Sequence, residues 1–257
     1  MNATWVYCIV SSAEPPQTAN APAGPPGAGR VRALDVRPGR YLIVSDAPLD
    51  RFGEAPLAAG LADLDGVSRV AVAHEAVTES FMASSPVDAV VPMKLFTLFA
   101  NDARALAQVR SSWRRIDVTL RRLRRHEEWG VRLVFDATRA PARADAAPGD
   151  GGSGRSYLQA KRQQRRATAA RATEMRRVAG GALKTLGALA RDVQRRAVAA
   201  APEGSSRLLL DAAFLVPRAK ATRFRALADR YAKKIAPGGY ALQLSGPWPP
   251  YSFAGNA

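Results

Sequence analysis

The sequence contains very little of the side-chain chemistry that catalysis and transition-metal binding require. It has one cysteine and two histidines in 257 residues. Neither histidine has a second ligand at helical spacing, and a single cysteine cannot form a Cys-x-x-Cys pair. The common zinc motifs are therefore missing. We interpret His74-Glu75 and His126-Glu127-Glu128 as polar residues at helix ends. We expect no catalytic residue, no bound metal and no cofactor.

Disulfides and long apolar runs are also missing. The single thiol, Cys8, lies in the apolar segment 5–10, where it is expected to behave as a small buried hydrophobe, and one cysteine cannot form an internal bridge. That apolar run is too short to cross a membrane and lacks the pattern of a signal peptide. We therefore expect a cytoplasmic protein that makes no membrane contact.

Acidic residues are scarce relative to basic ones, with 22 Asp and Glu against 38 Lys and Arg and a formal net charge of +16. Residues 151–200 contain ten arginines and two lysines against two carboxylates, and residues 104–125 contain eight arginines against one. Such a chain attracts acidic partners, whether protein, nucleic acid or anionic lipid. Aromatic residues make up only 7% and form no stacking motif, so nucleic-acid binding is the alternative interpretation.

Strands dominate the start of the chain. Residues 4–10 are β-branched and aromatic on both faces, which predicts a strand covered on two sides. Residues 11–29 contain five prolines and predict a mobile, extended loop with no packing face. Segments 34–36 and 41–44 flank a Pro-Gly turn and predict a hairpin. A helix over 74–82 is expected next.

A single amphipathic helix is predicted over residues 101–123, after an extended segment that ends near Phe99. Asn101 or Asp102 can cap it. Its apolar residues step by three and four along one stripe. They are Leu106, Val109, Trp113, Ile116, Leu120 and Leu123.

The C-terminal half combines a long helix with three strands. A helix over 157–199 carries a narrow apolar seam, and its early part, 161–177, is polar all round and is expected to project or to meet a partner. The seam consists of Met175, Ala179, Ala182, Leu186, Leu189 and Val193. The predicted order is strand 129–135, this helix, strand 207–216, helix 219–235 and strand 240–244. That order is a split βαβ sandwich with one strand unaccounted for.

These elements predict the α+β class with two domains. Residues 1–127 form an N-terminal α+β domain. Residues 128–257 form a modified ferredoxin-like sandwich with a long basic helix, a flexible insert at 137–154 and a C-terminal tail.

Six segments, in order along the chain, resemble the landmarks of the GvpF/GvpL gas vesicle family. They are residues 5–10 (WVYCIV), 74–77 (HEAV), 91–96 (VPMKLF), 128–133 (EWGVRL), 154–158 (GRSYL) and 244–253 (LSGPWPPYSF). The chain departs from the family at residues 94–97 (KLFT), where Arg-Phe-Gly is often found. This departure leaves the F and L subgroups open.

The resemblance implies a gas vesicle accessory protein that associates with the major shell protein and with other accessory gas vesicle proteins, and it implies no cofactor. Two segments are candidate protein contacts. The tail is stiffened by prolines and carries large aromatic surfaces, although it could instead fold back over the sheet of its own domain. The basic helix is expected to bind acidic partner surfaces. The candidate residues are Trp248, Pro249, Pro250, Tyr251 and Phe253 in the tail, and Arg162, Arg165 and Arg166 in the helix.

Overall fold

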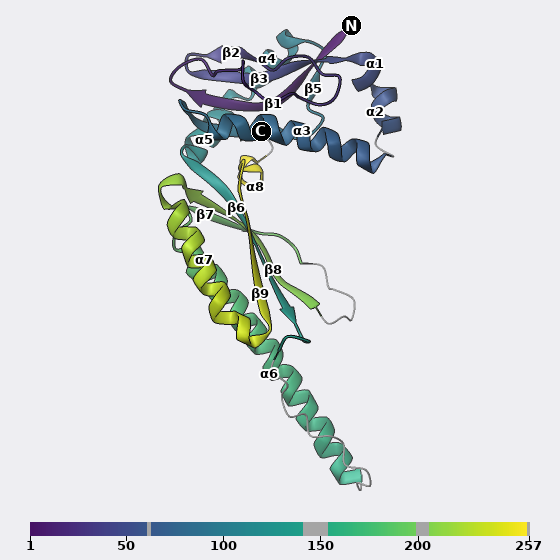
Figure 1. Ribbon diagram of the computed structural model, residues 1–257, viewed down its shortest axis with the longest axis vertical. Coiled ribbons are helices and arrows are strands. Elements are labelled where there is room, and N and C mark those ends of the chain that lie inside the picture. Colours follow the sequence, from purple (N-terminus) through teal and green to yellow (C-terminus); the bar gives the residue numbers. More distant parts are fainter. Residues whose placement is uncertain (61–62, 141–153, 199–205, 256–257) are drawn as a thin grey trace. The chain divides into compact units, whose positions relative to one another are not determined.

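The chain divides into two compact units (Figure 1). The structure is a computed structural model that describes residues 1–60, 63–140, 154–198 and 206–255. One unit comprises Met1–Glu128 together with Pro247–Ala257, and the other comprises Trp129–Gly246. The boundary between Glu128 and Trp129 lies one residue from the predicted boundary between residues 127 and 128. The prediction assigned the tail to the C-terminal domain, whereas the structure groups it with the N-terminal unit. Most of the predicted insert, residues 141–153, lies outside the described residues.

The N-terminal unit is built on an antiparallel sheet in the order β2-β3-β1-β4, with β5 paired to β1. The predicted hairpin is β2 and β3, and its turn holds Gly39 at a φ of 69°, a conformation that glycine adopts without strain. The strands are β1 (Asn2–Ser12), β2 (Arg32–Arg37), β3 (Arg40–Pro48), β4 (Val87–Pro92) and β5 (Leu98–Phe99).

Helices cover this sheet so completely that every residue of β1 after Asn2 is buried, which confirms the prediction of a strand covered on two sides. Val77 and Phe81 of α3 pack into the same buried cluster as Trp5 and Tyr7. The helices of this unit are α1 (Leu49–Phe52), α2 (Glu54–Gly60), α3 (Leu64–Ala83), α4 (Asp102–Ser111), α5 (Trp113–Leu123) and α8 (Tyr251–Ala254).

Two predictions for this unit need correction. The single helix expected over 101–123 is two helices separated at Ser112. Adjacent serines are weak helix formers, and the Ser111 hydroxyl donates to the carbonyl of Gln108. The predicted cap is confirmed, since the Asn101 side chain accepts a hydrogen bond from the Arg104 amide.

The proline-rich segment also differs from its prediction, because it does have a packing face. Pro16 and Pro25 are buried. A Cβ added at Gly24 would come within 2.0 Å of the Tyr7 hydroxyl, so this part of the loop lies directly against the core. Apolar contact with the sheet therefore orders a segment whose composition suggested an unpacked chain.

The second unit contains a sheet in the order β7-β8-β6-β9. Helix α6 connects β6 to β7, and α7 connects β8 to β9. The strands are β6 (His126–Asp136), β7 (Asp192–Arg195), β8 (Ser206–Pro217) and β9 (Tyr240–Trp248). The helical segments are α6 (Gly154–Gly187), η1 (Arg218–Lys220), α7 (Ala221–Ile235) and η2 (Ala236–Gly238).

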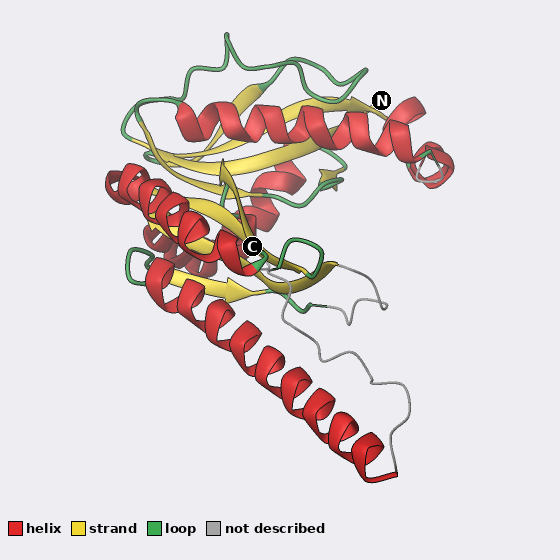
Figure 2. Cartoon of the chain, turned by 60° about the horizontal axis from the view of Figure 1, so that its bottom comes forward, coloured by secondary structure: helices red, strands yellow, loops and turns green. Residues whose placement is uncertain are grey.

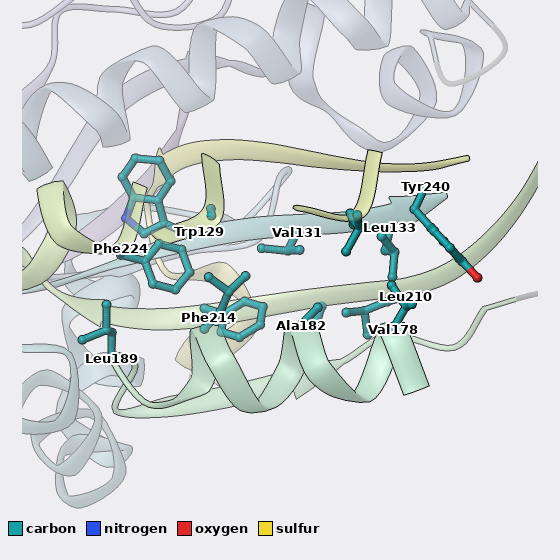
Figure 3. Close-up of a cluster of buried hydrophobic side chains, with 14 of the residues drawn as sticks. Trp129, Val131, Leu133, Val178, Ala182, Leu189, Leu210, Phe214, Phe224 and Tyr240 are labelled. Carbon is teal, nitrogen blue, oxygen red and sulfur yellow. The ribbon is translucent and has the colours of Figure 1, made fainter. Parts of the chain in front are cut away.

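Both long helices of this unit pack on one core with the strands. Figure 3 shows Val178 and Ala182 of α6 directed toward the strands that carry Val131 and Phe214. Phe224 of α7 joins the same cluster, with its ring centroid 5.5 Å from that of Phe214. Burial of these side chains is the main stabilisation of the unit.

The predicted helix over 157–199 is too long. Helix α6 ends at Gly187, and a turn through Leu189 and Ala190 leads into β7, where Val193 packs from the strand rather than from the helix. Strand β7 is the strand that the sequence left unaccounted for.

The N-terminal half of α6 extends beyond the strands (Figures 1 and 2). Every residue from Tyr157 to Arg171 is exposed, whereas Val178, Ala182 and Leu186 are buried. This matches the expectation that the polar first part of the helix projects and that the later part packs.

Two adjacent glycines in α6 provide a test of this packing. A Cβ at Gly180 meets nothing within 4 Å, so Gly180→Ala should raise the free energy of unfolding by up to about 1 kcal/mol through helix propensity. A Cβ at Gly181 would lie 2.5 Å from the Tyr231 hydroxyl, which donates to the Val178 carbonyl at 2.7 Å. Gly181→Ala should therefore be less stable than Gly180→Ala by at least about 1 kcal/mol. Urea unfolding curves measure both, and equal stabilities would contradict the packing.

Candidate functional site

The structure places the tail on the N-terminal unit, where α8 contacts β4 and α5. Pro249, Pro250 and Phe253 are buried, and Tyr251 is half-buried. Trp248 is 41% exposed. The alternative that the tail covers the sheet of the C-terminal domain is wrong, because the segment packs with the other unit. Of the predicted tail contacts, Trp248 offers the largest free surface.

A buried carboxylate fastens the tail. Glu128 is 4% exposed, and its carboxylate accepts hydrogen bonds from the amide of Ser252 at 2.8 Å and from the Ser252 hydroxyl at 2.7 Å. Nearby, the Arg122 guanidinium lies 5.8 Å from the centroid of the Phe253 ring. Two hydrogen bonds from Ser252 to one buried side chain fix the position of α8.

The Tyr251 hydroxyl and the Glu75 carboxyl form a second buried polar cluster in the same unit. The Tyr251 hydroxyl is buried near Glu75 and Thr78, and no described atom partners it at good hydrogen-bond geometry. Burial raises the pKa of Glu75, and the charges of Glu79 and Glu128 raise it further. Burial also raises the pKa of Tyr251 well above its ordinary value. The cluster is thus buried and rich in acidic side chains, as expected of a packed junction.

His74 is part of the core rather than of a helix end, which corrects the sequence interpretation. It lies in the middle of α3 and is 2% exposed. Its Nδ1 accepts from the Trp5 indole N–H at 3.0 Å, and its Nε2 donates to the Met93 carbonyl oxygen at 3.2 Å. Both bonds fit the neutral imidazole, and burial lowers the pKa of His74.

Five of the six landmark segments take part in one of two hydrogen-bonded contacts. Trp5, His74 and Met93 form one hydrogen-bonded chain, and Glu128 and Ser252 form another. The sequence interpretation placed Glu75 and Glu128 at helix ends, whereas Glu75 lies inside α3 and Glu128 lies in β6. It assigned no role to Ser252, although all three lie in the landmark segments. Their arrangement holds the core and the tail together.

The arginines predicted on the long helix belong to the C-terminal unit. Arg162, Arg165 and Arg166 are all exposed. Positions separated by three and four residues share one face of a helix, so the three guanidinium groups present a common basic surface. Such a surface can bind acidic groups without any deep pocket.

A further basic surface, not predicted as a site, surrounds Trp113 in the N-terminal unit. The Arg37 guanidinium lies 5.2 Å from the centroid of the Trp113 ring. Arg110, Arg114 and Arg115 line the same open hollow of about 640 Å³. Arg110, Arg114 and Arg115 are three of the eight arginines in residues 104–125.

The described residues contain no gathering of three or more histidine, cysteine or acidic side chains that could hold a metal ion. Within the same ranges, no helix combines the length and apolarity needed to cross a membrane.

Comparisons with known proteins agree with the landmarks. Residues 3–255 match the family described as gas vesicle synthesis protein GvpL/GvpF. Gas vesicle protein L of Streptomyces sp. (strain CB03234) is 33% identical over 252 residues, which cover 92% of this chain and 88% of that protein.

Solved structures show the same fold. The crystal structure of GvpF from Anabaena sp. PCC7120 aligns with a TM-score of 0.70 at 16% identity and covers 99% of this chain and 98% of its own. GvpF from Microcystis aeruginosa aligns with a TM-score of 0.69 at 15% identity, with 98% of each chain covered. The mixed α and β architecture is therefore that of these proteins. With a family match over nearly its whole length, the chain belongs to the gas vesicle synthesis protein GvpL/GvpF family.

Proposed function

We propose that this protein is an accessory factor in gas vesicle assembly, which acts in the cytoplasm and at the gas vesicle by binding the major shell protein and other accessory gas vesicle proteins. The observation that carries the proposal is the family match over residues 3–255. No reaction is needed for this role, and the buried polar clusters described above are consistent with a scaffold that works through its surfaces.

The finer fold assignment is part of the same proposal. A ferredoxin-like sandwich runs β-α-β-β-α-β, with its first and third strands central. In the C-terminal unit, β6 and β8 are central, β7 and β9 are at the edges, and α6 and α7 make the two crossovers. This order supports a modified ferredoxin-like unit from which the basic helix extends.

Charge gives the proposal a mechanism. Shell subunits that await assembly expose apolar surface, and a carrier with a strongly charged surface keeps such complexes soluble. The exposed face of Arg162, Arg165 and Arg166 supports contact with acidic surfaces of the partner proteins. Trp248 remains our candidate for an apolar contact in the tail.

A pull-down with the major shell protein and the accessory proteins tests the proposal. Replacing Arg162, Arg165 and Arg166 together with glutamine should weaken capture of an acidic partner about tenfold at low salt, since each charge contact contributes a fraction of a kcal/mol. The matched control changes the same residues to lysine, which keeps the charge. Binding of the wild-type chain should also weaken as ionic strength rises.

The outcomes separate the two functional interpretations. If the wild-type chain captures no gas vesicle protein, the proposal is wrong. If it instead binds duplex DNA tightly at physiological salt, with a steep salt dependence, the nucleic-acid alternative replaces it. The hollow around Trp113 is the first place to examine in that case.

A further inference from the structure

An apolar groove lies in the C-terminal unit between α6 and the beginning of β8. Its volume is about 630 Å³. Met175, Ala179 and Leu183 of α6 line one side, and Leu208 and Leu209 of β8 line the other. All five side chains are half-buried, so the groove presents apolar surface that the described residues of the unit leave partly uncovered.

The groove exists because β7 covers only part of β8. The register of β7 with β8 runs from Asp192 opposite Leu215 to Arg195 opposite Ala212, and one more bond joins the Arg196 amide to the Asp211 carbonyl. The first residues of β8 lie beyond this described ladder. The helix above them also lacks a side chain at Gly180, where an added Cβ would meet nothing within 4 Å.

Three arginines stand at the edge of this groove. Arg176, Arg195 and Arg207 are exposed, and none of the described lining residues is acidic. Two carboxylates close to these arginines in the sequence have other arginine partners. Glu174 is bonded to Arg177, and Asp211 is bridged by Arg132 and Arg196. The edge of the groove therefore keeps a net positive charge.

We propose that this groove binds an acidic amphipathic segment of a partner protein, with apolar side chains in the groove and carboxylates on the three arginines. The inference rests on the proposed function, since it assumes that the chain works by protein contact. Charge decides the occupant: a basic segment would be repelled, and a segment with apolar anchors and acidic flanks matches both the lining and its edge. Among the described residues that line the groove, none has an aromatic side chain on which a nucleic-acid base could stack.

A designed peptide tests the groove directly. The probe is a labelled helical peptide of about four turns, with leucines at helical spacing and glutamates beside them, and a second peptide replaces each glutamate with glutamine. The full-length chain should bind the acidic peptide at least about tenfold more tightly than the neutral one. Replacing Arg176, Arg195 and Arg207 with glutamine should remove that difference.

Gly180 supplies the matched pair of variants. Gly180→Trp puts a large side chain into the groove and should weaken peptide binding at least about tenfold, whereas Gly180→Ala leaves room and should bind as the wild type does. Circular dichroism and unfolding curves check that both variants fold. If Gly180→Trp does not fold, the test relies on the variant in which the three arginines at the edge of the groove are replaced with glutamine. The inference is overturned if the acidic peptide binds a folded Gly180→Trp variant as tightly as it binds the wild type. Equal binding by the variant in which Arg176, Arg195 and Arg207 are replaced with glutamine overturns it too.

Failure of the inference and failure of the proposed function give different results. If the wild type captures gas vesicle proteins and Gly180→Trp captures them equally well, the groove is not the contact but the function stands. If the wild type captures none of them, the function fails, whatever the peptide does.

Discussion

Phe253→Ala should lower the free energy of unfolding of the N-terminal unit by about 3–5 kcal/mol, the usual cost of deleting a buried phenylalanine side chain. Phe253 is 1% exposed and belongs to α8, which contacts β4 and α5. A helix of four residues has almost no stability of its own. It is held by this ring and by the bonds of Glu128 to Ser252, so loss of the ring should also free the tail.

Urea unfolding followed by circular dichroism measures the stability, and limited proteolysis measures release of the tail. Trp248→Ala is the matched control, because it removes a larger aromatic residue from the same segment at a position that is 41% exposed. We expect the control to cost less than about 1 kcal/mol and to leave the tail protected. A Phe253→Ala protein as stable and as resistant as the control would show that the tail does not pack as described.

This packing changes how the tail should be tested as a partner contact. A chain that ends at Leu244 loses Trp248 and also loses the buried Phe253 and the partner of Glu128. Weaker capture of the shell protein by that truncation would follow from a damaged N-terminal unit as readily as from a lost contact. The single change Trp248→Ala separates the two causes, since it leaves Phe253 and the bonds between Glu128 and Ser252 in place.

Regular hydrophobic patterns were enough to predict most of the secondary structure. The sequence predicted the core strand β1, the hairpin and the apolar stripe from Val109 to Leu123. Each of these elements has a regular run of apolar residues along the face or faces that it buries. Strand β7 was missed because it is four residues long and contains little apolar surface. It forms through pairing with β8, which is a tertiary effect that local propensity does not record.

Contacts between distant segments were the other part that could not be predicted. The tail looked available in the sequence because its prolines and aromatics suit a binding segment. Its burial depends on Glu128, which is 124 residues away from Ser252. The family likeness correctly pointed to the segments involved, but the residue roles required the fold.

One bulky residue of the N-terminal unit has a backbone conformation that favours glycine. Phe96 adopts a φ of 62°. This region favours glycine, and a bulky side chain there is strained. The Phe96 ring lies edge-on against Trp5, with centroids 5.6 Å apart, and this contact offsets the strain.

Acidification below the ordinary histidine pKa, near 6.5, should destabilise the N-terminal unit through His74. Burial holds the pKa of His74 below that value in the folded protein. Between the two pKa values the unfolded chain binds a proton that the folded chain does not, so stability falls as pH falls. The slope approaches about 1.4 kcal/mol per pH unit and ends where the folded pKa is reached. Protonation would also leave Nδ1 unable to accept from Trp5, which is 69 residues away in the sequence.

His74→Gln isolates this contribution, because the amide can still offer an acceptor and a donor but does not titrate. Glu75 must be considered in the same experiment, since its raised pKa has the opposite sign: the folded chain takes up its proton first, and stability rises on acidification. Both proteins keep Glu75, so the difference between their unfolding free energies from pH 7 to pH 5 reports His74 alone. The wild type should lose stability relative to the variant across this range. Parallel profiles would mean that the imidazole titrates in the folded protein as it does in the unfolded chain, and would contradict its burial.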